Sequence, residues 1–133
     1  MTSSLPVELT VLGWSVVLLF VHIMIQGVTA TRERGVAWNA GPRDGMAPLK
    51  GQVAGRAQRA LDNFKETYPA FIALALALAV SGRTGGPGGL GAELWLGARV
   101  VYLPLYLFGV PYLRTAVFGL SAVGLVMMLS RLF

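Results

Sequence analysis

The sequence predicts an all-α integral membrane protein folded as a four-helix bundle. Only 13% of its 133 residues are charged, and 55% are hydrophobic. Soluble domains usually carry about 25% charged residues, so this low content favours lipid as the main solvent. Four apolar segments follow one another along the chain, and three of them are near the roughly 20 residues that a spanning helix needs. The length fits a single domain, residues 1–133.

The first two spans are expected at residues 8–31 and 57–81. The first has no charge after Glu8 and exceeds the roughly 7–15 apolar residues of a signal peptide, so we interpret it as a retained helix. The second apolar run starts only at Thr67 and is too short alone. It reaches spanning length if the helix begins inside the charged stretch "GRAQRALDNFKETYP". A linker rich in Gly and Pro, residues 81–91, then ends it.

The last two spans are expected at residues 89–108 and 113–132. The third span contains Arg99, and Pro104 predicts a kink near its end. The stretch "GVPYLR" between the two spans predicts a tight turn that returns the chain into the membrane.

The positive residues predict the orientation. Six of the eleven Lys and Arg residues fall between positions 31 and 60. The positive-inside bias therefore places the loop 32–55 in the cytoplasm. Four spans return the chain to its starting side, so both termini are expected on the outer side of the membrane. Interfacial aromatic belts predict Trp14 and Trp95 at the outer boundary and Trp38 at the inner one.

Composition excludes several classes of function. The chain has no cysteine and a single histidine, His22, so no thiolate nucleophile, disulfide or cluster of metal ligands of these types is expected. The net charge is +5, but the basic residues lie beside apolar segments, so no nucleic-acid partner is expected. His22 and Gln26 lie one turn apart in the first span. Hydrogen bonds across helices are favoured for both over a role in proton transfer or ligand binding.

Two of the expected helices each present a narrow polar stripe. At about 100° per residue, the stripe on the second helix spans an arc of roughly 80° and contains Arg56, Arg59, Asn63 and Glu66. The stripe on the third helix spans an arc of roughly 60° and contains Arg99, Tyr102 and Tyr106. Ionisable groups inside a bilayer cost a few kcal/mol each, so they face the bundle interior or a wet cavity.

These stripes have two interpretations. In the first, they only pair with one another, Glu66 with Arg99 at a similar depth and Asn63 with a backbone carbonyl. In the second, the pairing of Glu66 with Arg99 leaves surplus arginine that binds an anion. Planar guanidinium groups in a partly buried cleft suit such a ligand. The excess of arginine over acidic residues in and beside the stripes favours the second interpretation.

The two stretches of sequence that contain these stripes, residues 56–69 and 98–114, resemble the MAPEG superfamily. Its members are small integral membrane proteins of eicosanoid and glutathione metabolism. The family pattern on the second helix, R-x-x-x-N-x-x-E, is matched by Arg59, Asn63 and Glu66. The pattern R-x-x-[YH]-x-x-x-Y on the third helix, with an arginine near the start of the fourth, is matched by Arg99, Tyr102, Tyr106 and Arg114. By this resemblance, which covers residues 55–133 best, the chain is identified as a bacterial-type member. The resemblance implies the inner membrane of a bacterium, where the outward-facing termini would lie in the periplasm.

The resemblance implies a homotrimer that binds glutathione as a co-substrate between neighbouring subunits, near the cytoplasmic side. Arg59 would hold a glutathione carboxylate, while Asn63 and Glu66 would hold its peptide backbone and its amine. The peptide would be lined by Arg99, Tyr102 and Tyr106. Arg114 would lie near the sulfur and act as the catalytic residue, because a fixed cation stabilises a thiolate.

The expected activity is that of a glutathione-dependent transferase or peroxidase-like enzyme acting on lipophilic small molecules from the bilayer. Two departures from the family pattern support an alternative. Thr67 stands where several relatives carry a tyrosine, and the segment 31–55 is longer than in the mammalian enzymes. The alternative is a non-enzymatic member, either a structural subunit of a larger membrane complex or a lipid-binding protein.

Overall fold

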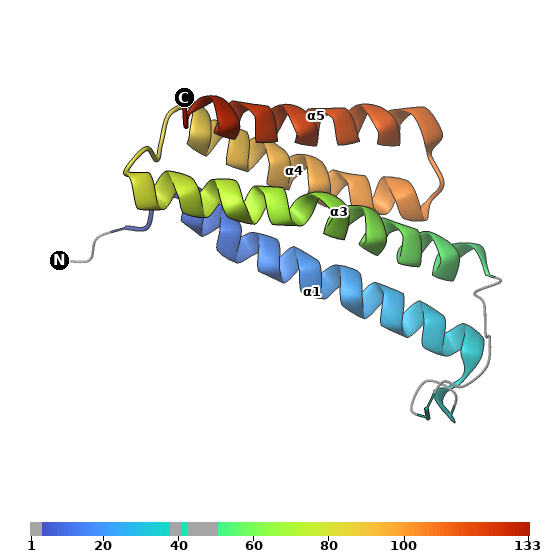
Figure 1. Cartoon of the computed structure of the whole chain (residues 1–133). Coiled ribbons are helices and arrows are strands. Elements are labelled where there is room, and N and C mark those ends of the chain that lie inside the picture. Colours follow the sequence, from blue (N-terminus) through green and yellow to red (C-terminus); the bar gives the residue numbers. More distant parts are fainter. Residues whose placement is uncertain (1–3, 38–40, 43–50) are drawn as a thin grey trace.

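The computed structural model describes residues 4–37, 41–42 and 51–133. Part of the predicted loop 32–55, including Trp38, lies outside them. The described residues form no strand, which confirms the all-α prediction, and their helices are α1 (Val7–Arg34), α3 (Gln52–Ser81), α4 (Pro87–Leu107) and α5 (Pro111–Ser130). Figure 1 shows the four helices side by side. The α4–α5 turn lies at one end of the bundle, and both termini and the α3–α4 linker lie at the other.

The ends of the helices follow from local sequence. Gly35, with a φ of 95°, ends α1 in a backbone conformation that side chains disfavour. Gly82 ends α3 in the left-handed region, with a φ of 72°. Helices α4 and α5 begin at Pro87 and Pro111, because proline in the first turn sacrifices no intrahelical hydrogen bond.

Three of these helices, α1, α3 and α5, are long and apolar enough to cross a membrane. Helix α4 is slightly longer than α5 but carries Glu93 and Arg99, and it is not among the three. It contacts α5 most extensively and also touches α1 and α3. Arg99 is buried among these neighbours, as expected for an ionisable group that turns into a membrane bundle, whereas Glu93 is exposed.

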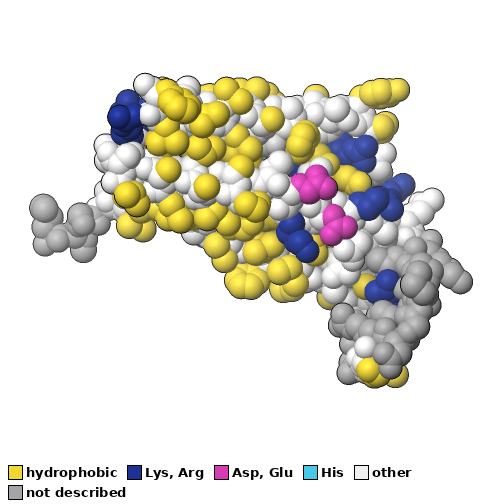
Figure 2. Space-filling model, viewed as in Figure 1, with side chains coloured by type: hydrophobic (Ala, Val, Ile, Leu, Met, Phe, Trp, Pro, Cys, Tyr) yellow, Lys and Arg dark blue, Asp and Glu magenta, His cyan; other side chains and the backbone are white. Residues whose placement is uncertain are grey.

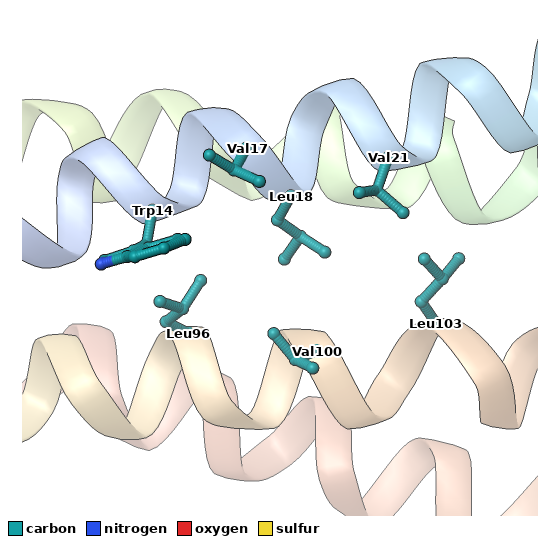
Figure 3. A pocket seen from close by; sticks show the side chains of 7 residues that line it. All are labelled: Trp14, Val17, Leu18, Val21, Leu96, Val100 and Leu103. Carbon is teal, nitrogen blue, oxygen red and sulfur yellow. The ribbon is translucent and has the colours of Figure 1, made fainter.

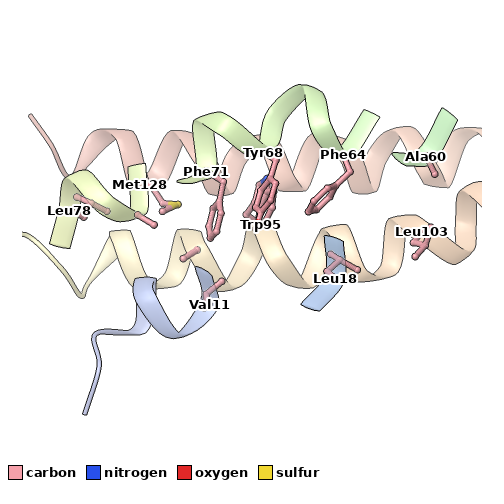
Figure 4. Close-up of a cluster of buried hydrophobic side chains, with 12 residues drawn as sticks. Val11, Leu18, Ala60, Phe64, Tyr68, Phe71, Leu78, Trp95, Leu103 and Met128 are labelled. Carbon is pink, nitrogen blue, oxygen red and sulfur yellow. The ribbon is translucent and has the colours of Figure 1, made fainter. Parts of the chain in front are cut away.

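The core contains a column of aromatic side chains between α3 and α4 (Figure 4). Phe71 and Trp95 are fully buried and stack in nearly parallel planes, with their ring centroids 4.0 Å apart. Tyr68 lies beside Trp95, and its hydroxyl forms a 2.9 Å hydrogen bond with the Ser15 hydroxyl on α1. The predicted interfacial position of Trp95 is therefore wrong, because the rings of α3 offer it a stacking partner. Trp14, by contrast, is 63% exposed.

Helices α4 and α5 come closest together where two glycines meet. A methyl group at Gly91 would lie 2.5 Å from the Gly124 carbonyl oxygen, and one at Gly124 would lie equally close to the Gly91 carbonyl oxygen. Small residues let helix backbones approach one another in membrane bundles. The contact joins the first turns of α4 to the last turns of α5, at the end where the termini lie.

Glu8 is buried at this same end of the bundle. Its Oε2 accepts a 2.8 Å hydrogen bond from the Gly85 N–H, just before α4 begins. Gly88 leaves room for the carboxylate, since a methyl group there would lie 2.7 Å from Oε2. The carboxylate also faces the N-terminal end of α4, where the helix dipole favours negative charge. Sequence reasoning missed this contact, although the predicted topology already put Glu8 and the glycine-rich linker on one side.

Candidate functional site

A cleft of about 250 Å³ lies at the opposite end of the bundle, beside the α4–α5 turn. Its lining comes from three helices and consists of Asn63, Tyr102, Tyr106, Arg114, Thr115 and Phe118. The first four of these are predicted site residues. The structure therefore brings one member of the α3 stripe, two members of the α4 stripe and the arginine of α5 into one cavity.

Arg114 is half-buried in the first turn of α5. Its guanidinium carbon lies over the Tyr106 ring, 4.5 Å from the centroid, in a cation–π contact. Within the described residues, no hydrogen bond or ion pair joins Arg114 to a carboxylate. The N–H groups at the start of a helix add to the positive potential. The cleft therefore carries a positive charge that no acidic side chain of its own lining neutralises.

Arg99 is fully buried and is not part of the cleft lining. Its Nη1 donates a 2.7 Å hydrogen bond to Asn63 Oδ1, which does line the cleft. Its guanidinium carbon lies 4.5 Å from the centroid of Tyr102 and 5.9 Å from that of Phe118. The predicted ion pair with Glu66 is wrong, because Glu66 is exposed and Asn63 takes its place as the partner of Arg99.

The rest of the α3 stripe does not reach the cleft within one subunit. Arg59 and Glu66 are exposed and absent from its lining. Asn63 is the stripe residue that faces α4, and Glu66 lies roughly 60° further round the helix. Asp62 and Lys65 are exposed as well. Figure 2 shows acidic and basic side chains gathered over the first half of α3, whereas the face over its second half is mostly hydrophobic.

Arg56 has a structural partner instead of a place in the cleft. Its Nη1 donates a 3.2 Å hydrogen bond to the Leu107 carbonyl oxygen, at the C-terminal end of α4. Gly109, with a φ of 73°, makes room for the guanidinium, since a methyl group there would lie 2.8 Å from its central carbon. Two lining residues were not expected from the sequence, Thr115 and Phe118. Phe118 follows Arg114 by four residues, so helical spacing would have placed both on one face.

The two polar residues of α1 differ in their contacts. Gln26 Nε2 donates a 2.8 Å hydrogen bond to Gln58 Oε1 on α3, the kind of bond across helices that the sequence predicts. His22 is buried, and neither ring nitrogen has a hydrogen-bond partner within the described residues. Its ring stacks on Phe64, with the centroids 4.8 Å apart. The predicted hydrogen bond is therefore wrong for His22, which contributes a packed ring.

A second and larger hollow, the α1–α4 groove, has about 440 Å³ and lies between these two helices (Figure 3). Its lining consists of Trp14, Val17, Leu18, Val21, Leu96, Val100 and Leu103. Leu18 and Leu103 are buried at its floor, while Trp14 and Val100 are exposed at its rim. These side chains suit hydrocarbon and offer no charged group. Within the described part of the chain, no cluster of three or more His, Asp or Glu residues fits a metal ion.

Comparison with known proteins gives a match over almost the whole described bundle. The model of the MAPEG family matches residues 11–133. No curated protein and no solved structure matches the chain. The matched region contains the lining of the 250 Å³ cleft and all but the first residues of α1.

Proposed function

The chain belongs to the MAPEG family, an integral membrane helical bundle, and on that premise we propose that it is a glutathione-dependent transferase or peroxidase-like enzyme. Its substrates would be lipophilic electrophiles that arrive from the bilayer. The observation that carries the proposal is the cleft, in which Arg114 and two tyrosines meet Asn63 without any acidic residue in the lining. Such a cavity suits an anionic co-substrate, and the glutathione thiolate is one.

The working assembly we propose is a homotrimer with the co-substrate between subunits. Helix α3 is apolar enough to cross a membrane, yet Arg59, Asp62, Lys65 and Glu66 are exposed on its outer face. Charged side chains in hydrocarbon cost a few kcal/mol each, so this face needs a protein partner. A second copy of the chain would cover it and bring Arg59 and Glu66 to the mouth of a neighbour's cleft. There Arg59 would meet a carboxylate of glutathione, and Glu66 would meet its amine outside the cleft.

In the proposed reaction, Arg114 stabilises negative charge and does not act as a base. An arginine keeps its proton at all accessible pH values, so it stabilises a thiolate and donates hydrogen bonds to it. A fixed cation lowers the pKa of a nearby thiol, which releases its proton to solvent. The thiolate sulfur then attacks the electrophilic carbon, a C–S bond forms, and the leaving group departs with the displaced electron pair. Tyr102 and Tyr106 would line the peptide from α4.

Exchange of Arg114 tests this role. Loss of one donor at a developing charge typically lowers turnover by about 10²–10³-fold, so Arg114→Ala is expected to lose that much conjugation of a generic aryl halide with glutathione. Ultraviolet absorbance of the bound thiolate should fall in parallel. Arg114→Lys should keep binding but lose most of the rate, since it lacks the planar fork. Arg131→Ala, at the far end of the bundle, is the matched control. If both Arg114 variants keep wild-type turnover and thiolate signal, Arg114 has no catalytic role and serves only as a membrane anchor.

The α1–α4 groove supports a second candidate, a lipid-binding or structural member, also within a larger membrane complex. Its 440 Å³ are lined by apolar side chains alone, and it exceeds the polar cleft in volume. Mass spectrometry of the protein purified in mild detergent separates the two candidates. Retained glutathione with turnover supports the enzyme, whereas retained lipid without glutathione binding supports the alternative.

The location we propose is the inner membrane of a bacterium, with both termini in the periplasm. The end of the bundle that holds the cleft carries Arg56, Arg59, Lys65 and Arg114. Positive residues mark the cytoplasmic side, so glutathione would enter from the cytoplasm. Labelling of single cysteines introduced at Ser4 and at Ala37 with a membrane-impermeant reagent in intact cells checks this. We expect labelling at position 4 and none at position 37.

A further inference from the structure

We propose that Arg99 is a positioning residue that fixes the amide of Asn63 with its NH₂ group toward the cleft, so that the cleft receives the anionic end of its ligand and not the ammonium end. The name of that ligand, glutathione, rests on the proposed function. The orientation of the amide rests on the contacts of Arg99 alone, and it can be tested without any ligand.

The orientation follows from hydrogen-bond chemistry. An arginine side chain has five N–H donors and no acceptor. The Asn63 atom that lies 2.7 Å from Arg99 Nη1 must therefore be the carbonyl oxygen Oδ1. The NH₂ group then occupies the other branch of the planar amide. Within the described residues it donates to no protein atom, and Asn63 lines the cleft. Both N–H donors of the amide are thus available to a ligand.

Arg99 lies outside the lining of the cleft but contributes positive electrostatic potential to it. It is fully buried, it is absent from the lining, and its guanidinium is enclosed by the rings of Phe64, Tyr102 and Phe118. No carboxylate bonds to it within the described part of the chain, so its positive charge is not neutralised. A charge in such surroundings is weakly screened and is felt by a ligand in the adjacent cavity.

The cleft therefore presents donors and positive charge without an acidic counterpart. Asn63 offers two N–H groups, Arg114 offers its guanidinium, and Arg99 adds its charge from below. A carboxylate or thiolate finds charged donors here, whereas an ammonium group finds no carboxylate in the lining. The carboxylate nearest in sequence, Glu66, is exposed on the outer face of α3. The two ends of a zwitterionic ligand are therefore sorted, with the anion in the cleft and the amine outside it.

Substitution of Asn63 by aspartate replaces the NH₂ donor by a negatively charged oxygen and leaves the shape of the side chain almost unchanged. Asn63→Asp would form an ion pair with Arg99 and present a carboxylate to the cleft. We expect thermal stability equal to or above that of the wild type, with glutathione affinity weaker by about tenfold or more, the order of one lost charge-assisted hydrogen bond. A merely structural role of Asn63 would change stability and affinity in the same direction.

Arg99→Met tests whether Arg99 acts through Asn63. We expect it to weaken glutathione binding by about tenfold in the wild-type background, and much less in an Asn63→Leu background, where no amide remains to be positioned. Equal weakening in both backgrounds would mean that Arg99 acts on the ligand independently of Asn63, through its charge or by direct contact, and would overturn the positioning role. Arg99→Lys, which keeps charge and one donor, serves if Arg99→Met does not fold, and it should retain most of the affinity.

A ligand-free readout separates this inference from the proposed function. The sequence holds two asparagines, Asn39 and Asn63, so selective ¹⁵N labelling gives two side-chain NH₂ signals, and Asn63→Leu identifies the one from Asn63. We expect Arg99→Met to shift the Asn63 signal and leave that of Asn39 in place. An unchanged Asn63 signal overturns the positioning role even if glutathione binds. Conversely, a shifted signal in a protein that binds no glutathione refutes the proposed function alone.

Discussion

The two ends of the bundle are built from the same four helices but differ in packing, because one end is closely packed and the other holds a polar cleft. At the end that holds the termini, glycines let α4 and α5 touch through their backbones, and Glu8 is enclosed against the α3–α4 linker. At the other end, Tyr102, Arg114 and their neighbours are large and polar, and they leave a cleft of about 250 Å³. Small residues close one end and thereby stabilise the bundle, which allows the opposite end to hold charged groups around a cavity.

The largest effect on stability is expected from Gly91→Ala. Its methyl group would lie 2.5 Å from the Gly124 carbonyl oxygen, and a backbone atom cannot move aside as a flexible side chain does. We expect a loss of about 1–3 kcal/mol, the usual cost of overpacking, measured by thermal unfolding in detergent. Gly97→Ala on the same helix is the matched control, because its methyl group would meet nothing within 4 Å. Equal stability of the two variants would contradict the close contact.

A smaller effect is expected from Glu8→Ala. The substitution leaves the Gly85 N–H without its acceptor at the start of α4, a loss comparable to that of a helix cap, about 0.5–2 kcal/mol. Glu8→Gln keeps an acceptor oxygen and should lose less. Glu93→Ala, which removes an exposed acid from α4, should change stability by no more than about 0.5 kcal/mol. If Glu8→Ala unfolds at the wild-type temperature, the carboxylate does not hold this end together.

The smallest effect is expected from His22→Phe, in the middle of the bundle. His22 makes no hydrogen bond within the described residues but stacks on Phe64, so a phenyl ring preserves its contact and removes two unpaired polar atoms. We expect a change below about 1.5 kcal/mol in either direction. His22→Ala should cost more, because it loses the stacking and leaves a cavity. A large loss in His22→Phe alone would mean that the imidazole nitrogens matter.

Much of the cleft could be predicted because helical periodicity acts within a single element. The spacing of Tyr102 and Tyr106 puts both on one face of α4 whatever the neighbours do. The partner of Arg99 could not be predicted in this way. Asn63 and Glu66 differ by roughly 60° around α3, and the choice between them depends on the rotation of α3 against α4, which no local pattern specifies.

The burial of Trp95 and Glu8 escaped prediction for a related reason. Tryptophan has a common role at membrane boundaries, and composition alone favours that role for Trp95. Their actual positions depend on partners distant in sequence, the rings of α3 for Trp95 and the linker glycines for Glu8. The topology predicted from the four spans already put Glu8 on the same side as those glycines. The contact between them could therefore have been predicted from the sequence.

We propose that one end of the bundle stabilises the fold and the other binds the ligand. The most direct test is calorimetric titration of glutathione into wild-type protein, Gly91→Ala and Arg114→Ala, at a temperature where all three are folded. The account predicts saturable binding to the wild type and to Gly91→Ala with similar affinity, although the latter unfolds at a lower temperature. It predicts that Arg114→Ala unfolds like the wild type but binds at least about tenfold more weakly. No saturable heat with the wild type, or equal affinity in Arg114→Ala, would contradict the claim that the arginine-lined cleft binds glutathione.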